Sequence, residues 1–245
     1  FFVLPESLQK ENRRAFSWKR ANPLGSLKFL NKHPEIGGLA ICFFLIYLGA
    51  QSVQGNWSFF TMHRFHWTEK MVGISLAVVG VMVGLVQAGL TRVLNPKLGN
   101  EKSIYLGLSL YTLGLLLFAF ATQSWMMYAF LIPYCLGGIA GPALQSILAG
   151  HVTPNEQGEL QGALTSLMSL TTIIGPPIMN NLFTYFTRSN APFYFPGIHF
   201  ALGAICMLAS VILANYVLTR EKKEKPELLS IIEGSATPAD QAPVH

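Results

Sequence analysis

Charged residues are scarce in this sequence of 245 residues. Asp, Glu, Lys and Arg together make up 12% of it, about half the share that is usual in soluble domains. A helix needs about 20 apolar residues to cross a bilayer. Five long intervals of the sequence contain no charged residue, and in order along the chain they have room for one, one, two, one and one helices. The sequence therefore predicts a polytopic membrane protein and excludes a water-soluble enzyme. The intervals contain 28, 21, 53, 28 and 31 residues and lie between Glu35 and Arg64, Lys70 and Arg92, Lys102 and Glu156, Glu159 and Arg188, and Arg188 and Arg220.

Patterns that would indicate enzymatic or metal chemistry are also missing. The sequence contains no P-loop, no HExxH, no GxSxG and no dinucleotide fingerprint, so neither an ATP-driven pump nor a membrane enzyme has motif support. We expect no enzymatic activity and no cofactor. Cys42, Cys135 and Cys206 lie in three different apolar segments and are interpreted as small packing residues. His63 and His66 form an incomplete ligand set, so no metal site is expected there.

Carboxylates are missing from the predicted spans. All 12 acidic residues lie in loops, at predicted helix ends or in the tail. Proton relays in transporters use intramembrane Asp, Glu or His. The chain therefore supplies no obvious proton carrier, and an acid that couples transport to protons would belong to a missing part. His151 and His199 lie near predicted helix ends and are interpreted as membrane-interface residues.

The uncharged intervals predict an all-α integral membrane fold with six transmembrane helices. Residues 1–35 are interpreted as the end of a preceding helix and a basic cytoplasmic loop, 36–218 as the six-helix bundle, and 219–245 as a disordered cytoplasmic tail. The chain opens on an apolar stub without an initiator Met, so we expect it to be the second part of a longer protein. The six helices are predicted at roughly 36–60, 70–92, 102–121, 126–149, 159–185 and 193–218.

Lys and Arg are distributed unevenly among the connections. Residues 9–35, the connection after the second helix and the tail hold fourteen of the 17, whereas the opposite side holds only Arg64, Lys70 and Arg188. Cytoplasmic loops are enriched in Lys and Arg, so both termini are predicted to be cytoplasmic. The net charge of +5 is thereby explained by topology and by contact with lipid headgroups, and no nucleic-acid partner is expected.

Amides are the most polar side chains inside the predicted spans. Gln51 and Gln54 share a face of the first helix with Tyr47 and Ser58, because the spacings are three and four residues. Gln87 shares a face of the second helix with two glycines, Gly80 and Gly84. Such residues either hold helices together or line a polar substrate cavity, and an amide in lipid needs a partner or water in both cases. Gly162, Ser166, Ser169 and Thr172 of the fifth helix share a face with the same two interpretations.

Gly and Pro interrupt two of the predicted helices. Gly175, Pro176 and Pro177 lie deep in the fifth helix, where proline removes backbone donors and bends a helix. Gly137-Gly138 and Gly141-Pro142 weaken the fourth helix in the same way. Bent helices beside a cavity are common in secondary transporters, although Gly and Pro are also generally more frequent in membrane helices.

Two stretches of the sequence carry a recognisable series of short motifs. The first reads FHW at 65–67, MVGISLA at 71–77, GVM at 80–82 and LVQA at 85–88, and the second reads GGI at 137–139, PALQ at 142–145, QGELQG at 157–162, SLMSLT at 166–171 and IGP at 174–176. Together they resemble the C-terminal half of the tetracycline efflux antiporters of the major facilitator superfamily. In the resemblance, Val83 stands where those antiporters carry a His, and Tyr111 stands where they carry an acidic residue, whereas Gln87 matches. Leu4-Pro5-Glu6-Ser7 and Lys97-Leu98-Gly99 also resemble family loop motifs.

The resemblance implies a bacterial inner-membrane antiporter with twelve helices, of which this chain holds the last six. It implies proton-coupled efflux of a small drug-like molecule, with two six-helix halves that alternate about a midplane site. The expected partners are the substrate, protons, the lipid bilayer and the N-terminal half. Two alternatives remain open: a superfamily carrier for another solute such as a sugar or metabolite, and a membrane scaffold or receptor that transports nothing. The expected substrate-binding residues are Gln51, Gln54, Gln87 and Tyr111, and the expected bending or packing residues are Gly80, Gly84, Gly141, Pro142, Gly175 and Pro176.

Overall fold

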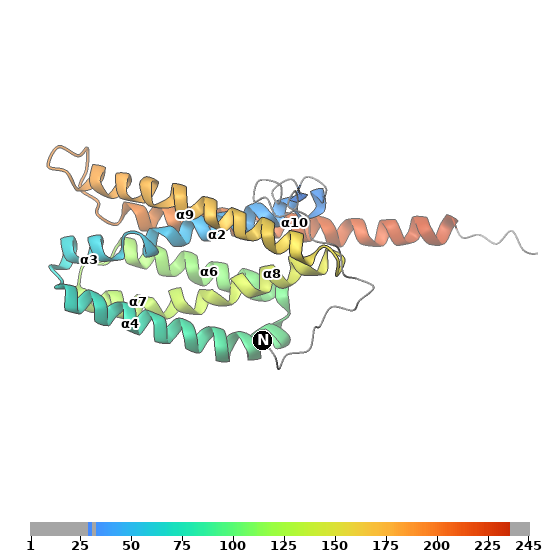
Figure 1. Cartoon of the computed structure of the whole chain (residues 1–245), viewed down its shortest axis with the longest axis horizontal. Coiled ribbons are helices and arrows are strands. Elements are labelled where there is room, and N and C mark those ends of the chain that lie inside the picture. Colours follow the sequence, from blue (N-terminus) through green and yellow to red (C-terminus); the bar gives the residue numbers. More distant parts are fainter. Residues whose placement is uncertain (1–28, 31–32, 236–245) are drawn as a thin grey trace, which may run out of the picture.

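The computed structural model describes residues 29–30 and 33–235, and every regular element in this part of the chain is a helix. The expectations for residues 1–28 lie outside the described residues. Figure 1 shows the helices running roughly parallel along the long axis of the molecule. The elements are α2 (Pro34–Gln54), α3 (Trp57–Phe65), α4 (Glu69–Leu85), the π-helical η2 (Val86–Leu90), α5 (Thr91–Leu98), α6 (Asn100–Ala119), α7 (Ser124–Leu136), the 3₁₀-helical η3 (Gly137–Ile139), α8 (Ala140–Gly150), α9 (Gln157–Thr187) and α10 (Ile198–Ser235).

Six stretches of helix are long and apolar enough to cross a membrane, which confirms the predicted all-α fold with six spans. The chain reverses direction after each span, so the connections alternate between two ends. The "Gly99 end" holds Gly99 and the 151–156 loop, and the "Trp67 end" holds 66–68, 120–123 and 188–197. The spans are Ile36–Gln54, Glu69–Leu98, Asn100–Ala119, Ser124–Gly150, Gln157–Thr187 and Ile198–Arg220.

Two connections differ from those expected. The first predicted helix is broken after Gln54 and resumes at Trp57 as α3, which extends to Phe65. The connection expected between the helices at 70–92 and 102–121 is reduced to one residue, because helix continues to Leu98 and α6 begins at Asn100. That residue, Gly99, has a φ of +79°, a conformation that glycine adopts without steric cost.

Small residues allow α2 and α10 to pack closely as an antiparallel pair. The Cys42 Sγ donates to the Ser210 carbonyl at 3.6 Å, and the Ser210 Oγ donates to the Cys42 carbonyl at 3.2 Å. A Cβ added to Gly49 would lie only 3.0 Å from the Gly203 carbonyl oxygen. Close approach of this kind is how membrane helices gain packing energy without a hydrophobic driving force. Cys42, Cys135 and Cys206 are free and buried, as the packing interpretation expects.

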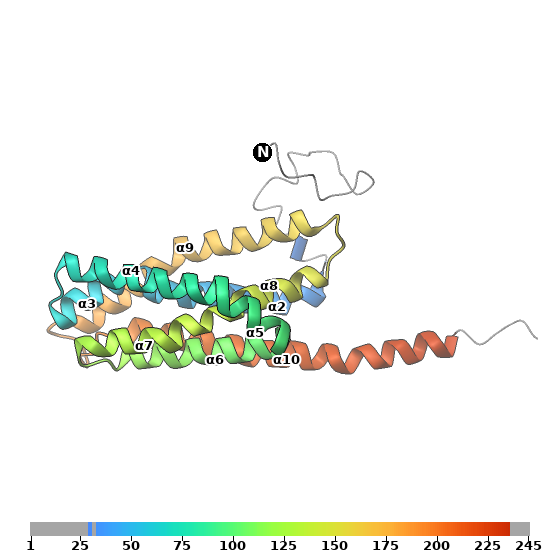
Figure 2. The ribbon, with the colours of Figure 1, turned by 90° about the horizontal axis from the view of Figure 1, so that it is seen from below.

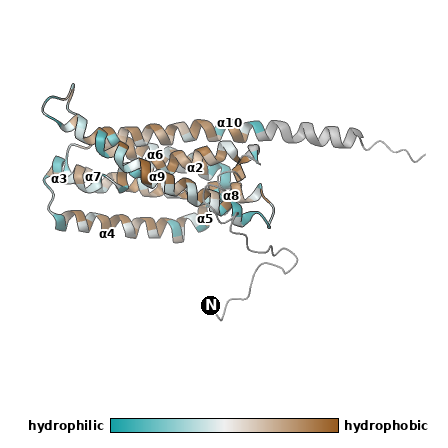
Figure 3. Cartoon of the chain, turned by 45° about the horizontal axis from the view of Figure 1, so that its top comes forward, coloured by the Kyte–Doolittle hydropathy of each residue, from teal (hydrophilic) through white to brown (hydrophobic). Residues whose placement is uncertain are grey.

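Two of the spans are packed much less than the others. Only 17% of the most apolar stretch of Glu69–Leu98 is buried, and 28% of that of Gln157–Thr187, against 56% for Ile36–Gln54. At the margin of the bundle lies α9 in Figure 2 and α4 in Figure 3, and the helices are hydrophobic along most of their length in Figure 3. Apolar side chains such as Leu85 (68% exposed) and Ile173 (69% exposed) point outward. The bundle therefore leaves one face of each of these helices uncovered.

The last helix is longer than predicted. A disordered tail was expected from residue 219, but α10 continues to Ser235 and projects beyond the rest of the bundle in Figure 1. This corrects the tail prediction for residues 219–235. The reason is local: the segment is rich in Glu, Lys and Leu, which have high helix propensity, and the helix is already nucleated by the membrane span before it.

Candidate functional site

Two non-α segments from different spans meet in the middle of the bundle. The π-helical η2 interrupts the second span, and its Val86 carbonyl accepts from both the backbone N–H and the hydroxyl of Thr91, the latter at 3.0 Å. The 3₁₀ turn η3 interrupts the fourth span at Gly137, where the sequence predicted a weakened helix. A Cβ on Gly138 would lie 3.8 Å from Val86 Cγ1, so η2 packs against η3. Single π turns inside α-helices occur frequently at functional sites.

Tyr111 lies beside this junction. A Cβ on Gly137 would fall 2.6 Å from the Cγ of the Tyr111 ring, and one on Gly138 would fall 3.7 Å from its hydroxyl oxygen. The ring also meets Tyr134 edge-on, with centroids 5.2 Å apart. Tyr111 is half-buried, so the glycines at 137 and 138 provide the space in which its ring and hydroxyl sit.

Tyr47 and Gln145 extend this polar group toward α2 and α8. The side chain of Gln145 lies within hydrogen-bonding reach of the Tyr47 hydroxyl, and both residues are half-buried. Tyr47 lies close enough to Tyr111 for their hydroxyls to interact electrostatically. The sequence indicated the polar character of Tyr47 and Gln145 but could not show that they meet, because they lie almost one hundred residues apart.

Gln51 lies inside the bundle. Its side chain is only 5% exposed, and a Cβ on Gly175 would lie 2.5 Å from its Cγ. Gly55 approaches Pro176 from the same helix, with 3.9 Å between a Cβ added to Gly55 and the Pro176 Cα. Gln51, Gly175 and Pro176 therefore form the contact between α2 and α9. The helix α9 runs through Pro176 and Pro177 without interruption.

The remaining predicted residues face outward. Gln54, Gln87 and Pro142 are exposed, as are Gly80 and Gly84. A Cβ on Gly80, Gly84 or Gly141 would meet no atom within 4 Å. These three glycines consequently hold no helices together within the described part of the chain. The structure thus divides the predicted site into a buried part around Gln51 and Tyr111 and an exposed part that includes Gln54 and Gln87.

Hydroxyl groups along α9 donate hydrogen bonds to carbonyls of their own helix. Ser166, Ser169 and Thr172 each donate to a carbonyl of α9 itself, at 2.8, 2.9 and 2.7 Å. Ser169 and Thr172 are exposed. A hydroxyl that donates to its own helix keeps acceptor lone pairs available, so this face can receive hydrogen bonds from a group that approaches from outside.

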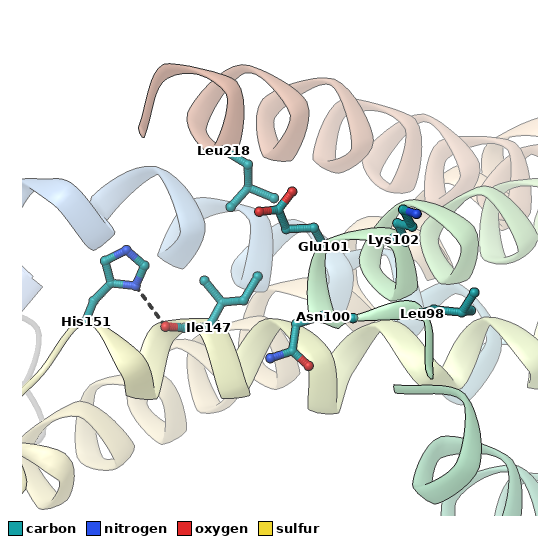
Figure 4. Close-up of a pocket in the computed structure, with 8 residues that line it drawn as sticks. Leu98, Asn100, Glu101, Lys102, Ile147, His151 and Leu218 are labelled. Carbon is teal, nitrogen blue, oxygen red and sulfur yellow. Dashed lines mark hydrogen bonds between the residues drawn. The ribbon is translucent and has the colours of Figure 1, made fainter. Parts of the chain in front are cut away.

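A separate pocket of about 460 Å³ lies at the Gly99 end. Figure 4 shows Glu101 and Lys102 entering it from the start of α6, with Leu218 from α10 and His151 from the end of α8. The His151 Nδ1 donates to the Ile147 carbonyl at 2.8 Å, and the Asn100 Nδ2 donates to Ser146 Oγ at 2.9 Å. None of the predicted substrate-binding residues lines this pocket, so it is distinct from the central group around Tyr111.

Two buried polar residues were missed by the sequence analysis. Asn56 lies at the break between α2 and α3 and is fully buried. His199, interpreted from sequence as a membrane-interface residue near a helix end, is also 0% exposed within the bundle. Its position two residues into α10 suggested an interface, but the aromatic residues that cover it come from α3 and α9, and no local sequence signal reveals them.

The fold defines an all-helical integral membrane protein with six candidate membrane spans. The sequence model of the Major Facilitator Superfamily matches residues 39–239. The chain belongs to the major facilitator superfamily, as the sequence predicted.

Curated relatives match the chain over part of their own length. It is 36% identical to the tetracycline resistance protein, class C, of Escherichia coli over 182 residues, which cover 74% of this chain and 46% of that protein. It is 41% identical to the class E protein over 149 residues, 61% of this chain and 37% of that protein. It is 26% identical to human hippocampus abundant transcript-like protein 1 over 88% of this chain and 46% of that protein. The chain thus spans about half the length of these relatives, or less.

A solved structure supports the fold. The crystal structure of the human organic anion transporter MFSD10 (TETRAN) matches with a TM-score of 0.72 and 21% sequence identity, over 86% of this chain and 52% of that chain. At this identity the likeness concerns the fold. The six helices accordingly form half of a major facilitator fold.

Proposed function

We propose that this chain is the C-terminal half of a secondary transporter that exports a small drug-like molecule of the tetracycline type in exchange for protons. The observation that carries the proposal is the uncovered face of the span Glu69–Leu98, of which only 17% is buried. That face carries Gln87 and two glycines with open space around them, Gly80 and Gly84. An exposed amide in hydrocarbon is costly, so the face is suited to water, substrate or another protein surface.

The partner for this face is the N-terminal six-helix half of the same transporter. Glycines that contact nothing in this chain offer a flat surface on which a second helix can pack closely. The exposed Ser169 and Thr172 of α9 offer polar contacts on the other weakly packed span. Rocking of one half against the other about these faces would open the central group alternately to each side, as alternating access requires.

The substrate would bind between the halves, where the exposed amides and the central tyrosine are available. Gln54 and Gln87 would hydrogen-bond to the substrate, and Tyr111 would supply a hydroxyl and an aromatic edge. Gln51 would support the site from the contact between α2 and α9, since Gly175 packs on its side chain. The tetracycline class is proposed because several relatives are tetracycline resistance proteins.

We place the Gly99 end in the cytoplasm of a bacterial cell, with the bundle in the inner membrane. Arg92, Lys97 and Lys102 flank the connection at that end, and Lys and Arg are enriched in cytoplasmic loops. The start of the first span and the end of the sixth span then both lie in the cytoplasm, because the number of spans is even.

Drug accumulation in cells tests the proposal. Cells that express the chain together with its N-terminal half should accumulate less tetracycline than cells without it, and a protonophore should abolish the difference. The matched control is the same pair of halves with Gln87→Ala, which should accumulate drug at nearly the control level. Unchanged accumulation in cells with both halves correctly inserted would exclude tetracycline export.

A second candidate is a major facilitator carrier for another small solute. It is favoured by Val83 and Tyr111, which stand where the tetracycline antiporters carry a His and an acidic residue. The protein can be titrated with tetracycline and with a panel of sugars and metabolites. This candidate would be favoured if tetracycline does not bind while a sugar or metabolite changes the protein's fluorescence or melting temperature.

A further inference from the structure

Two buried polar side chains near the Trp67 end make no hydrogen bond within the described structure. Asn56 is 0% exposed, and neither its amide nitrogen nor its amide oxygen has a partner. His199 is also 0% exposed, and both of its ring nitrogens are unpaired. Buried polar groups are nearly always hydrogen-bonded to protein or ordered water, so four such atoms in one region require an explanation.

The packing register places these two residues opposite each other. Going along α2, Gly38 meets Val217, Cys42 meets Ser210, and Ser52 meets Gly203 of α10. His199 precedes Val217 by 18 residues, which is five turns within α10, and Asn56 follows Gly38 by the same number of residues, across the break after Gln54. Both residues therefore continue the faces that already pack together.

The contacts of α3 agree with this placement. Phe60, one turn after Asn56, has its ring centroid 5.6 Å from that of His199 and 5.0 Å from that of Phe200. Phe60 N–H bonds to the Asn56 carbonyl at 2.9 Å, so Asn56 is the residue at which α3 begins. Asn56 and His199 consequently lie in one layer of the α2/α3–α10 contact.

Aromatic rings surround His199 on every element that packs there. Phe60 comes from α3, Phe183 from α9 with a centroid distance of 5.5 Å, and Phe200 from α10 itself. Phe118 of α6 lies behind Phe200 at 5.5 Å. In the described structure no carboxylate forms an ion pair with His199, and besides these rings the backbone of Pro196 lies beside it.

Further titratable groups approach through the Phe183 ring. His63 of α3 lies 5.6 Å from Phe183, centroid to centroid, and its Nε2 is 3.0 Å from the hydroxyl oxygen of Tyr194 in the α9–α10 connection. His63 and Tyr194 are exposed. They are the titratable groups that link the surface of the Trp67 end to the buried ring, and α6 presents Phe118 on its side of the layer.

We propose that Asn56 and His199 form a buried hydrated site that binds a proton. This inference rests on the proposed proton coupling and specifies where this half takes up its proton. Hydronium transfers its proton to the unprotonated ring nitrogen of His199 and remains as water, and the positive charge resides on the imidazolium. The Asn56 amide oxygen accepts a hydrogen bond from one ring N–H, directly or through the retained water. Release of the proton reverses these steps.

Histidine is suited to this task because its ordinary pKa lies in the physiological range, unlike that of the other side chains buried in these spans. Ionisable residues inside membrane spans commonly belong to ion or proton pathways. The carboxylates among the described residues lie at the ends of the spans, in connections or in the part of α10 beyond Arg220, so His199 is the fully buried side chain of these spans whose ordinary pKa lies nearest neutrality. The aromatic rings around His199 offer no hydrogen-bond acceptor for the second N–H of the imidazolium, and the Asn56 amide oxygen supplies one.

Infrared difference spectroscopy tests the site without requiring transport. The chain and its N-terminal half, with ring-labelled histidine, are reconstituted in phospholipid vesicles and stepped from pH 8 to pH 5. We expect an imidazole-to-imidazolium signal that disappears in His199→Phe, a variant that fits the aromatic surroundings but cannot bind a proton. Asn56→Leu should shift the midpoint of the same signal by at least half a pH unit. The control His66→Asn, at an exposed position of the same end, should leave the His199 signal unchanged.

Two results would overturn the inference: a His199→Phe spectrum equal to that of the wild type, or an Asn56→Leu variant with an unaltered midpoint. Melting temperatures establish that each variant is folded, and His199→Gln replaces any variant that is not. Export measured in the same vesicles separates the two proposals. A His199 signal without proton-driven export contradicts the coupling and leaves the site in place. Proton-driven export whose pH dependence survives His199→Phe contradicts the site and leaves the coupling in place.

Discussion

At the scale of single residues, the three glutamines differ in what surrounds them. Gln51 is 5% exposed and packs on Gly175, whereas Gln54 and Gln87 are exposed. A buried side chain contributes packing that the protein loses on truncation, and an exposed one contributes little to stability. The sequence predicted all three as amides of a polar face. It could not separate them, because burial depends on which helix lies opposite.

The first prediction concerns Gln87→Ala. Because Gln87 is exposed, its truncation should change the free energy of unfolding by less than about 0.5 kcal/mol. Export by the assembled transporter should nevertheless fall at least fivefold, since the amide faces the proposed substrate. Thermal unfolding in detergent and vesicle transport measure the two effects. Gln51→Ala provides the contrast, because it should destabilise the protein by about 1–2 kcal/mol.

A different result would reassign Gln87 to packing. If Gln87→Ala lowers the melting temperature and leaves transport per folded molecule unchanged, its amide belongs to a helix contact. Val83→His serves as a further control, because it introduces the ring that the tetracycline antiporters carry one turn before this glutamine.

The second prediction compares two glycines. A Cβ on Gly175 would lie 2.5 Å from Gln51 Cγ and 2.7 Å from Gln51 Cβ, whereas a Cβ on Gly80 would meet nothing within 4 Å. Gly175→Ala should therefore destabilise the chain by about 1–3 kcal/mol through overpacking of α2 against α9. Gly80→Ala should leave the stability of this chain nearly unchanged and weaken its association with the N-terminal half. Equal melting temperatures for the two variants would contradict the described α2–α9 contact.

At the scale of elements, the sequence predicted the helices better than their interruptions. Uncharged intervals of sufficient length reveal each span, because the bilayer imposes one length on all of them. Gly137-Gly138 indicated a weak point, and the structure has a 3₁₀ turn there. The π turn at Val86–Leu90 was not predicted. Its formation depends on packing against η3, and the residues VQAGL carry no signal of their own.

The third prediction concerns this π turn. A π turn contains one residue more than the α-helical path needs, so deletion of Ala88 should restore a regular helix. Because the π turn absorbs its extra residue locally, the helices on either side would keep their mutual orientation, while the residues inside the turn, Gln87 among them, would be repositioned. We expect circular dichroism and melting temperature close to those of the wild type, but transport reduced to background. Retained transport would show that the π turn is dispensable.

At the scale of the whole molecule, the sequence specified six helices and their order, and the structure adds which faces remain uncovered. The superfamily follows from motifs that the sequence contains, and the comparisons confirm it. The assignment of Gly80 and Gly84 to packing within this chain could not be checked by sequence alone, since a glycine looks the same whether it touches a helix or open space. The outward position of both residues indicates a surface for a second body.

The fourth prediction concerns the orientation of the bundle. The three native cysteines are buried, so a membrane-impermeant thiol reagent should report only on introduced ones. From outside intact cells it should label a cysteine placed at Ser189 and should not label one placed at Lys223, because the Gly99 end is proposed to be cytoplasmic. The opposite labelling pattern would reverse the topology.

The central claim is that this bundle transports only together with a second six-helix half, and one measurement tests it directly. Vesicles are prepared with this chain alone, with the N-terminal half alone and with both, and tetracycline flux is recorded after a proton gradient is imposed. The account predicts proton-driven flux in the vesicles with both halves and none in the other two, because the uncovered faces of α4 and α9 leave each site open. Proton-driven flux through vesicles that hold this chain alone would contradict the account.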